Sequence, residues 1–283
     1  MSEQQGPLAS REAPTRVVDV AGAGLVYRDL GPRSGVPLVV LTHLGANLDG
    51  WDPRILEGLS QDRRVIALSY RGVGDSTGQV RDSIEEMAAD ALGAIQGLGF
   101  DRIDLFGLSM GGMVAQAMAA KAPGSIDRLI LASSGPAGGP GILAMTRVMV
   151  STVLRAAVTF TDPRVLLFFT RTPAGRLAAR EYLVRLRERR SMREKGVSPG
   201  VYRAQLAAVH RWGRQQPADL SVWSGPVRIV HGDSDRIVPP ANAAALAGLL
   251  PAASVTMYPD SGHGAVFQHH SAFVAAARDF LRR

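Results

Sequence analysis

The sequence of 283 residues contains no cysteine. The protein therefore has no disulfide, no thiolate metal site and no cysteine nucleophile, and cysteine usage gives no indication of its redox compartment. The sequence also lacks a His-Glu-x-x-His motif, a phosphate-binding loop with its lysine, and a dinucleotide-binding fingerprint. We therefore expect neither a metal ion nor a nucleotide or flavin cofactor.

Long uninterrupted apolar runs are absent as well. The most apolar long segment, residues 142–169, is interrupted by three arginines and one aspartate, which is more charge than a membrane-spanning helix tolerates. The first 14 residues are polar and do not combine a basic region with an apolar stretch, as a secretory signal would. We expect a disordered leader over residues 1–14 and a cytoplasmic protein without a membrane span.

The net charge of +7 is unevenly distributed, and 30 of the 32 basic residues are arginine. Residues 137–215 hold 15 basic and 4 acidic residues, a net charge of +11, which leaves −4 for the remainder. The simplest interpretation is that arginines cover the outer faces of helices; attraction of an anionic substrate or an acidic carrier protein is the alternative. Basic and aromatic residues are not interleaved, so we expect no nucleic-acid partner. The sequence indicates no particular oligomeric state.

Strand-like and helix-like segments alternate over the first half of the chain. The apolar runs Pro37–Thr42 and Arg64–Leu68 suit strands that are buried on both faces of a parallel sheet. A helix-like stretch over residues 82–98 follows them, and Arg128–Ala132 is a further strand-like run. This alternation predicts an α/β fold with a doubly wound, mostly parallel sheet. Ahead of it, two strand-like runs within residues 15–28 flank Ala-Gly-Ala-Gly, which predicts a hairpin.

The alternation then gives way to a loop rich in glycine and proline. From Ile142 to Trp212 the signals are helical, interrupted near three prolines, and strand signals resume afterwards. We therefore expect an α/β core over residues 15–136 and 216–283, with a helical lid inserted over residues 137–215.

The pentapeptide Gly-Leu-Ser-Met-Gly at residues 107–111 stands between a strand-like run ending at Phe106 and a helix-prone segment beginning at Gly112. In this setting the turn holds its serine in a strained conformation, and the flanking glycines provide the room that a Cβ would occupy. The helix N-terminus behind the serine favours negative charge on a substrate oxygen. Ser109 is therefore the candidate nucleophile.

Acidic residues and a histidine follow the last two predicted strands. Val227–Val230 leads into a loop that contains Asp233 and Asp235, and Ser254–Tyr258 leads into a Gly-His-Gly loop around His263. The order serine, aspartate, histidine differs from the trypsin-like and subtilisin-like orders. Of the six histidines, only His263 follows the last predicted strand in a glycine-flanked loop, so it is the candidate base.

Four motifs resemble the α/β-hydrolase fold family, in particular its branch of lid-bearing serine esterases, haloperoxidase-type perhydrolases and C–C bond hydrolases. The resemblance covers residues 15–283 and implies an α/β-hydrolase fold with a helical lid. The motifs are Tyr-Arg-Gly-Val-Gly-Asp-Ser at 70–76, Gly-Leu-Ser-Met-Gly-Gly at 107–112, Gly-x-x-Asp-x-x-Val-Pro at 232–239 and Gly-His at 262–263.

The resemblance implies a role for each residue of a Ser-His-Asp triad. Ser109 would attack the substrate carbonyl, and His263 would take up the serine proton and return it to the leaving group. Asp235, which the family spacing selects over Asp233, would fix the imidazole tautomer. Asp233 would brace its loop.

An oxyanion hole would use two backbone N–H groups. One belongs to Met110, the residue after the nucleophile. The other comes from the loop after the third strand, where Leu44 replaces the glycine that commonly follows the histidine of this family. Counting from His43 selects Gly45 as the donor, with Leu44 as the alternative.

The expected reaction is hydrolysis of a small to medium carboxylic ester through an acyl-enzyme, which makes a small ester-like molecule the expected partner. Lactonase, thioesterase, perhydrolase and C–C bond hydrolase reactions use the same groups. A non-catalytic small-molecule receptor on this fold is a further alternative. Candidate pocket residues are His43, Leu44, Trp51, Met145, Met149, Trp212 and Phe267.

Overall fold

In the computed structural model, which describes residues 10–282, eight strands form one sheet in the order β1-β2-β4-β3-β5-β6-β7-β8. Strand β2 pairs antiparallel with β1 and β4, and all other neighbours are parallel. The predicted α/β class with a mostly parallel sheet is confirmed. The strands are β1 (Thr15–Val20), β2 (Ala23–Leu30), β3 (Leu38–Leu41), β4 (Val65–Leu68), β5 (Ile103–Leu108), β6 (Ile126–Ala132), β7 (Val227–Gly232) and β8 (Ala253–Tyr258).

The first two strands form the hairpin that the Ala-Gly-Ala-Gly sequence predicts. Val20 pairs with Ala23, so the turn consists of Ala21 and Gly22. Both turn residues have positive φ, 48° and 75° respectively. Two successive positive φ values give the turn the twist that suits adjacent antiparallel strands, and glycine supplies the second of them without strain.

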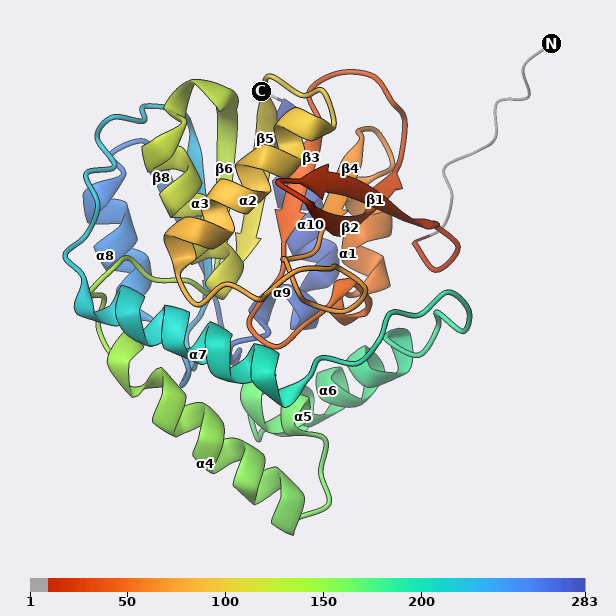
Figure 1. Ribbon diagram of the computed structural model, residues 1–283. Coiled ribbons are helices and arrows are strands. Elements are labelled where there is room, and N and C mark those ends of the chain that lie inside the picture. The colour runs from red at the N-terminus through yellow and green to blue at the C-terminus, as the bar shows by residue number, and fades with distance from the viewer. Residues whose placement is uncertain (1–9, 283) are drawn as a thin grey trace.

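Helices cover both faces of the sheet, which is why its central strands are apolar throughout. Along β3, Val39 and Leu41 belong to one apolar cluster, and Leu38 and Val40 belong to the other. Successive strand residues point to opposite faces, so such a strand is buried on both sides. Figure 1 shows α2 and α3 on one side of the sheet and α10 on the other. The helices of the core are α1 (Pro53–Leu59), α2 (Ile84–Gly97), α3 (Met110–Lys121), α8 (Ala241–Leu249), α9 (Ala265–Gln268) and α10 (His270–Arg282).

Between β6 and β7 the chain forms four further helices, which gather at one end of the sheet (Figure 1). We refer to residues 145–214, which contain these helices, as the insert. Three of the helices begin with a capping side chain followed by proline at the first helical position, where the missing N–H of proline does no harm. The prolines that interrupt the helical signal are thus helix starts. The helices are α4 (Met145–Val158), α5 (Pro163–Phe168), α6 (Pro173–Arg185) and α7 (Pro199–Arg214).

The predicted disordered leader, residues 1–14, lies partly outside the described residues, which begin at Ser10. Ser10 and Ala13 are buried. The Ser10 N–H donates to Glu57 at 3.1 Å, and Arg189 of the insert donates to the carbonyl oxygens of Ser10 and Ala13, each at 3.0 Å. Residues 10–13 are therefore packed between α1 and the insert. Within residues 10–282, no helix combines the length and apolar character that crossing a bilayer requires.

A buried ion pair attaches the insert to the core. Arg185, at the end of α6, donates to both carboxylate oxygens of Asp52 at 2.9 and 3.1 Å, and to the carbonyl oxygen of Phe267 at 3.1 Å. Asp52 is fully buried and also caps α1 by accepting the Arg54 N–H. One carboxylate thus fixes both the start of a core helix and the position of α6.

Replacing Arg185 with methionine leaves the Asp52 carboxylate buried without its cation. Removing one partner of a buried pair typically costs about 3 kcal/mol or more, so we expect the free energy of unfolding in urea to fall by about 3 kcal/mol. Arg187→Met, which removes an exposed arginine two residues further along the chain, serves as the control and should change it by less than about 0.5 kcal/mol. Equal effects of the two variants would contradict the role of Arg185.

Candidate active site

Ser109 lies in a sharp turn between β5 and α3, with φ 57° and ψ −118°. Its N–H donates to the carbonyl oxygen of Ala132 at 2.8 Å. A Cβ on Gly107 would lie 2.3 Å from the carbonyl oxygen of Gly111, and one on Gly111 would lie 2.2 Å from that of Leu41. Both glycines of the pentapeptide are therefore required by close contact between backbones, and a positive φ at Ser109 is the result.

The structure brings Ser109, His263 and Asp235 into one hydrogen-bonded chain. Ser109 Oγ lies 2.8 Å from His263 Nε2, and His263 Nδ1 lies 2.8 Å from Asp235 Oδ2. Ser109, His263 and Asp235 follow the carboxyl ends of β5, β8 and β7, respectively. These strands run parallel in one sheet, with β6 between β5 and β7, so their carboxyl ends lie at the same edge. All three are at least 96% buried. This geometry allows the imidazole to accept the hydroxyl proton from serine while the carboxylate fixes its tautomer.

Asp235 is held as a carboxylate by two backbone N–H groups and two neighbouring histidines. Its Oδ1 accepts the N–H groups of Ile237 and Val238 at 2.9 and 3.0 Å, and its Oδ2 lies 3.4 Å from His231 Nε2 in addition to the contact with His263. Burial favours the neutral acid, but the charge of His263 and the hydrogen bonds from His231 and His263 outweigh it and lower the pKa of Asp235 to about 2.

Asp233 lies elsewhere in the same loop. Its carboxylate accepts the N–H groups of Asp260 and Ser261 at 3.1 and 3.2 Å, and so ties the loop after β7 to the loop after β8. The other histidines, all within residues 10–282, form no hydrogen bond with Ser109. All six lie in the described part of the chain, and only His263 is within hydrogen-bonding distance of the serine; His231 donates to Val238, and His269 contacts the Ser261 hydroxyl at 2.7 Å.

The loop after β3 differs from the expected arrangement at Gly45. The Gly45 N–H donates to Gln205 Oε1 of α7 at 2.7 Å, so a side chain of the insert already accepts from this group. Among residues 10–282, the N–H groups of Leu44 and Met110 donate to no protein acceptor. The N–H of the expected donor, Gly45, is therefore already engaged, which favours the alternative, Leu44. The sequence could not predict that the Gly45 N–H is engaged, because its acceptor, Gln205 of α7, lies 160 residues further along the chain.

Ser109 and His263 border a cavity of about 730 Å³. Helices α4, α5 and α7 contribute apolar side chains to its wall. Four of the predicted pocket residues, His43, Leu44, Met145 and Met149, border it. Sequence reasoning missed Val150, Val153 and Leu154, which continue the apolar wall along α4. Val153 follows Met149 by four residues, and Leu154 follows Val150 by four, which is the helical periodicity that identifies one face.

The other three predicted pocket residues pack in the core instead. The ring of Trp51 lies 5.4 Å from that of Phe106, and the ring of Phe267 stacks on Tyr182 at 4.6 Å. Trp212 is buried against the core and donates to the carbonyl oxygen of Gly135 at 3.2 Å. None of the three borders the cavity, so we assign them to packing.

His43 is a neutral side chain at the cavity wall. Burial lowers its pKa to about 4. Its Nδ1–H donates to the carbonyl oxygen of Leu44 at 3.0 Å, and its ring packs edge-on against Phe168 at 5.0 Å. These contacts support the loop that carries Leu44.

The positive charge of the insert is largely absent from the cavity. Among the arginines of the insert, all of which lie in the described part of the chain, Arg164 and Arg193 border it. Arg164 forms an ion pair with Asp162 at 2.6 Å, and Asp49 and Glu194 also border the cavity. This distribution favours the interpretation that most of the arginines cover outer faces or attach the insert.

Comparison with known proteins agrees with the fold described above. Residues 36–270 match a protein family described as "alpha/beta hydrolase fold". A solved structure, the "Alpha/beta hydrolase fold protein from Chitinophaga pinensis", superposes with a TM-score of 0.91 at 32% identity, and the match covers 97% of this chain and 99% of that one. The chain therefore belongs to the α/β-hydrolase fold family.

Within the family, similar proteins carry different names. The chain is 30% identical, over 92% of its length, to the dihydrolipoyllysine-residue acetyltransferase component of the acetoin cleaving system of Pseudomonas putida, and spans 66% of that protein. It is 26% identical to the 2-hydroxymuconate semialdehyde hydrolase of Pseudomonas sp. (strain CF600) over 96% of each chain. It is 28% identical to the pimeloyl-[acyl-carrier protein] methyl ester esterase of Nitrosomonas europaea over 86% of this chain and 94% of that one. Two of these relatives are named as hydrolases and one as an acetyltransferase component, so their names support a hydrolase family and select no one substrate.

The depressed pKa of Asp235 predicts a pH dependence of stability. A carboxyl group whose pKa falls from 3.8 to about 2 on folding stabilises the native state above pH 4, and this stabilisation, about 2 kcal/mol, is lost as the pH falls toward 2. Asparagine at this position cannot titrate. In urea unfolding at pH 5 and pH 2, the difference between the native protein and Asp235→Asn should therefore shrink by about 2 kcal/mol at the lower pH. A difference that is independent of pH would show that Asp235 is not held as a carboxylate.

Proposed function

We propose that this protein is a serine ester hydrolase that works through an acyl-enzyme on Ser109. The observation that carries the proposal is the hydrogen-bonded chain of Ser109, His263 and Asp235 beside a cavity with mostly apolar walls. A hydroxyl group is a weak nucleophile at neutral pH and needs an adjacent base, and we assign this role to His263.

In the proposed reaction, Ser109 Oγ attacks the carbonyl carbon of the ester while His263 Nε2 takes its proton. The tetrahedral intermediate collapses, the bond to the alcohol oxygen breaks, and His263 gives the proton to that oxygen. Water then attacks the acyl-enzyme with His263 again as the base, which releases the carboxylic acid and restores the serine. Asp235 keeps the proton of the resting imidazole on Nδ1 and stabilises the imidazolium that forms.

The negative charge on the carbonyl oxygen of the intermediate needs fixed donors. We assign this role to the N–H groups of Met110 and Leu44, which have no protein acceptor among residues 10–282. Met110 opens α3, so the positive end of the helix dipole adds to its effect. Donors that are already in place cost no reorganisation during the reaction, which is why they lower the barrier.

The cavity supports esters with a substantial apolar group. Its volume of about 730 Å³ exceeds the needs of an acetyl group, and the walls from α4 provide a continuous apolar surface. In this proposal the insert acts as a lid that supplies most of the substrate contacts. A cytoplasmic location stays a prediction from the sequence.

The same groups also support cleavage of lactones, thioesters, peracid precursors and C–C bonds, and two of the relatives are named as a hydrolase of 2-hydroxymuconate semialdehyde and as a methyl ester esterase. We place ester cleavage ahead of C–C bond cleavage because an alcohol leaves once it receives the proton that His263 holds after the first step, whereas a carbon leaving group must also bear negative charge as it departs. The alternative function is that of a small-molecule receptor, which would bind a ligand in the same cavity without turnover.

The first test is hydrolysis of p-nitrophenyl acetate, butyrate, octanoate and dodecanoate by the native protein and by Ser109→Ala. We expect kcat/KM to fall by about 10⁴-fold or more in the variant because the covalent step is lost. Ser60→Ala, which removes an equally buried hydroxyl at the end of α1, is the control and should retain activity. No turnover of any ester by the folded native protein would rule out the proposed reaction.

The second test concerns the apolar wall from α4. Leu154 borders the cavity although its side chain is 64% exposed, and Val158, one helical turn further on, is 80% exposed and does not border it. Leu154→Asp should lower kcat/KM on the octanoate by about 10-fold, because apolar contact is worth about 0.8 kcal/mol per buried methylene, and leave the acetate within about twofold. Val158→Asp should change neither substrate, and an equal effect of both variants would argue against this wall.

A further inference from the structure

The backbone of Gly45 is held on both sides by helix α7 of the insert. Its N–H donates to Gln205 Oε1 at 2.7 Å, and its carbonyl oxygen accepts the Tyr202 hydroxyl at 3.1 Å. Residues three apart lie on the same face of a helix, so one face of α7 supplies both contacts. Gln205 is completely buried, which leaves its side chain little freedom to turn away.

The fit between Gly45 and α7 explains why this position is glycine. Gly45 has φ +74°, and a Cβ there would lie 2.2 Å from Cε1 of the Tyr202 ring. The glycine next to Leu44 is thus required by the contact with the insert, in contrast to the glycines beside Ser109, which contact only the core.

A second contact holds the far end of the same loop. Glu194, in the segment between α6 and α7, accepts the Leu48 N–H at 2.5 Å with Oε2, and its own N–H donates to Asp49 Oδ2 at 2.9 Å. Asn47 Nδ2 donates to the carbonyl oxygen of Lys195 at 2.9 Å. Residues 45, 47, 48 and 49 are therefore each hydrogen-bonded to the insert.

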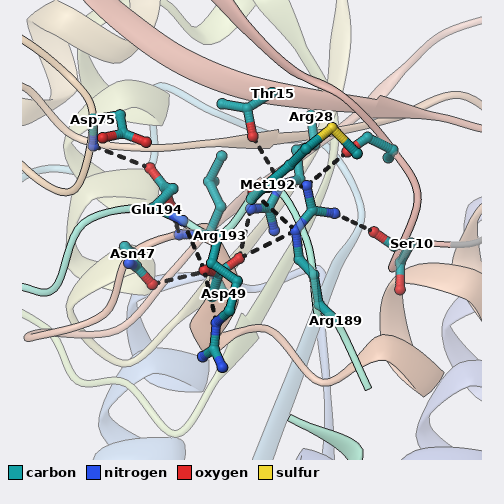
Figure 2. Close-up of polar contacts among 12 residues, drawn as sticks. Ser10, Thr15, Arg28, Asn47, Asp49, Asp75, Arg189, Met192, Arg193 and Glu194 are labelled. Atoms are coloured by element: carbon teal, nitrogen blue, oxygen red, sulfur yellow. Dashed lines mark hydrogen bonds and ion pairs between the residues drawn. The ribbon is translucent and has the colours of Figure 1, made fainter. Parts of the chain in front are cut away.

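Figure 2 shows that Asp49 stands at the centre of this attachment, with Arg28, Arg189 and Arg193 directed toward it. Arg28 comes from β2 and lies 2.5 Å from Asp49 Oδ1, and Arg189 and Arg193 come from the insert and lie 3.5 and 3.7 Å from the carboxylate. Arg28 and Asp49 are almost fully buried. Removing one partner from such a pair is costly, so this end of the loop is firmly fixed.

Leu44 lies between the strand and the contacts with α7. On one side β3 fixes the chain up to Leu41, and on the other side α7 fixes Gly45. The Leu44 N–H belongs to the peptide group immediately before the one that donates to Gln205. Only the two torsions of Leu44 separate these peptide groups, so few torsions are available to absorb a shift at Gly45, and we expect the shift to reach the Leu44 N–H.

We propose that Gln205, together with Tyr202, is a positioning residue that sets the oxyanion donor at Leu44, so that the insert and the oxyanion loop act as one unit. The inference rests on the proposed ester hydrolysis, and it extends that reaction to residues of the insert that touch no reacting atom. A donor stabilises the intermediate only when it points at the developing charge, and small displacements are costly.

The test compares Gln205→Leu, which removes the acceptor, with Gln205→Glu, which keeps an oxygen acceptor at the same length. On p-nitrophenyl butyrate we expect Gln205→Leu to lower kcat by about 10- to 100-fold with KM changed less than about threefold, because one oxyanion donor is worth roughly 10²- to 10³-fold. Binding of an alkyl boronic acid, which mimics the tetrahedral intermediate, should weaken by a similar factor. Gln205→Glu should return kcat to within about fivefold.

Two further variants separate positioning from folding. Tyr202→Phe removes the hydrogen bond to the Gly45 carbonyl from a side chain that is 41% exposed; it should keep the native melting temperature and lower kcat several-fold. Arg203→Gln, exposed on the same helix, should change nothing. If Gln205→Leu fails to fold, the value of kcat in Tyr202→Phe tests the proposal instead. Full kcat in a folded variant that lacks either contact, or a loss confined to KM, would overturn the proposal.

Hydrogen exchange gives a readout that does not depend on turnover. In the peptide covering residues 44–49, amide exchange should be about 10-fold faster or more in Gln205→Leu than in the native protein, and unchanged in Arg203→Gln. Unchanged exchange in Gln205→Leu would overturn the coupling between insert and loop. Absence of ester turnover by the native protein, with exchange altered as expected, would instead reject the proposed function and leave the coupling intact.

Discussion

The close approach of α3 to the sheet is the constraint on which the rest of the site depends. Gly111 brings the first turn of α3 against the end of β3, at a separation where a Cβ would meet the Leu41 carbonyl oxygen at 2.2 Å. This approach forces Ser109 into its turn and places Met110 at the helix N-terminus. It also places the serine beside the loop that follows β3, so a nucleophile and two potential oxyanion donors meet at one edge of the sheet.

The insert packs against the core through both apolar and ionic contacts. Its apolar faces continue the two clusters of the core, with α4 and α7 on one and α5 and α6 on the other. Its arginines reach core carboxylates, as in Arg185–Asp52 at 2.8 Å and Arg211–Asp82 at 2.7 Å, and Arg54 of the core reaches Glu188 at 2.6 Å. The concentration of arginine in the insert is thus explained in part by attachment to an acidic core, since guanidinium groups bind carboxylates in a fixed geometry.

Local signals predicted the parts of the structure that local sequence determines. The apolar run at 64–68 became β4, the stretch at 82–98 became α2, and the spacing of the last two motifs selected the aspartate and histidine that meet Ser109. Local sequence could not predict the hydrogen bond of the Gly45 N–H, because its partner, Gln205, lies on a helix that is distant in the chain. Trp51, Trp212 and Phe267 were assigned to the pocket from residue type alone, and aromatic side chains suit a core as well as a cavity. Placing them requires the packing of whole elements.

The most direct measurement is the mass of the protein during turnover. Mixing with p-nitrophenyl butyrate and quenching with acid within milliseconds should give a species heavier by one butyryl group, and proteolysis should locate that group on Ser109. The adduct should disappear as deacylation proceeds and should be absent from Ser109→Ala. Turnover without an adduct in the native protein, or an adduct on another residue, would contradict a covalent mechanism on Ser109.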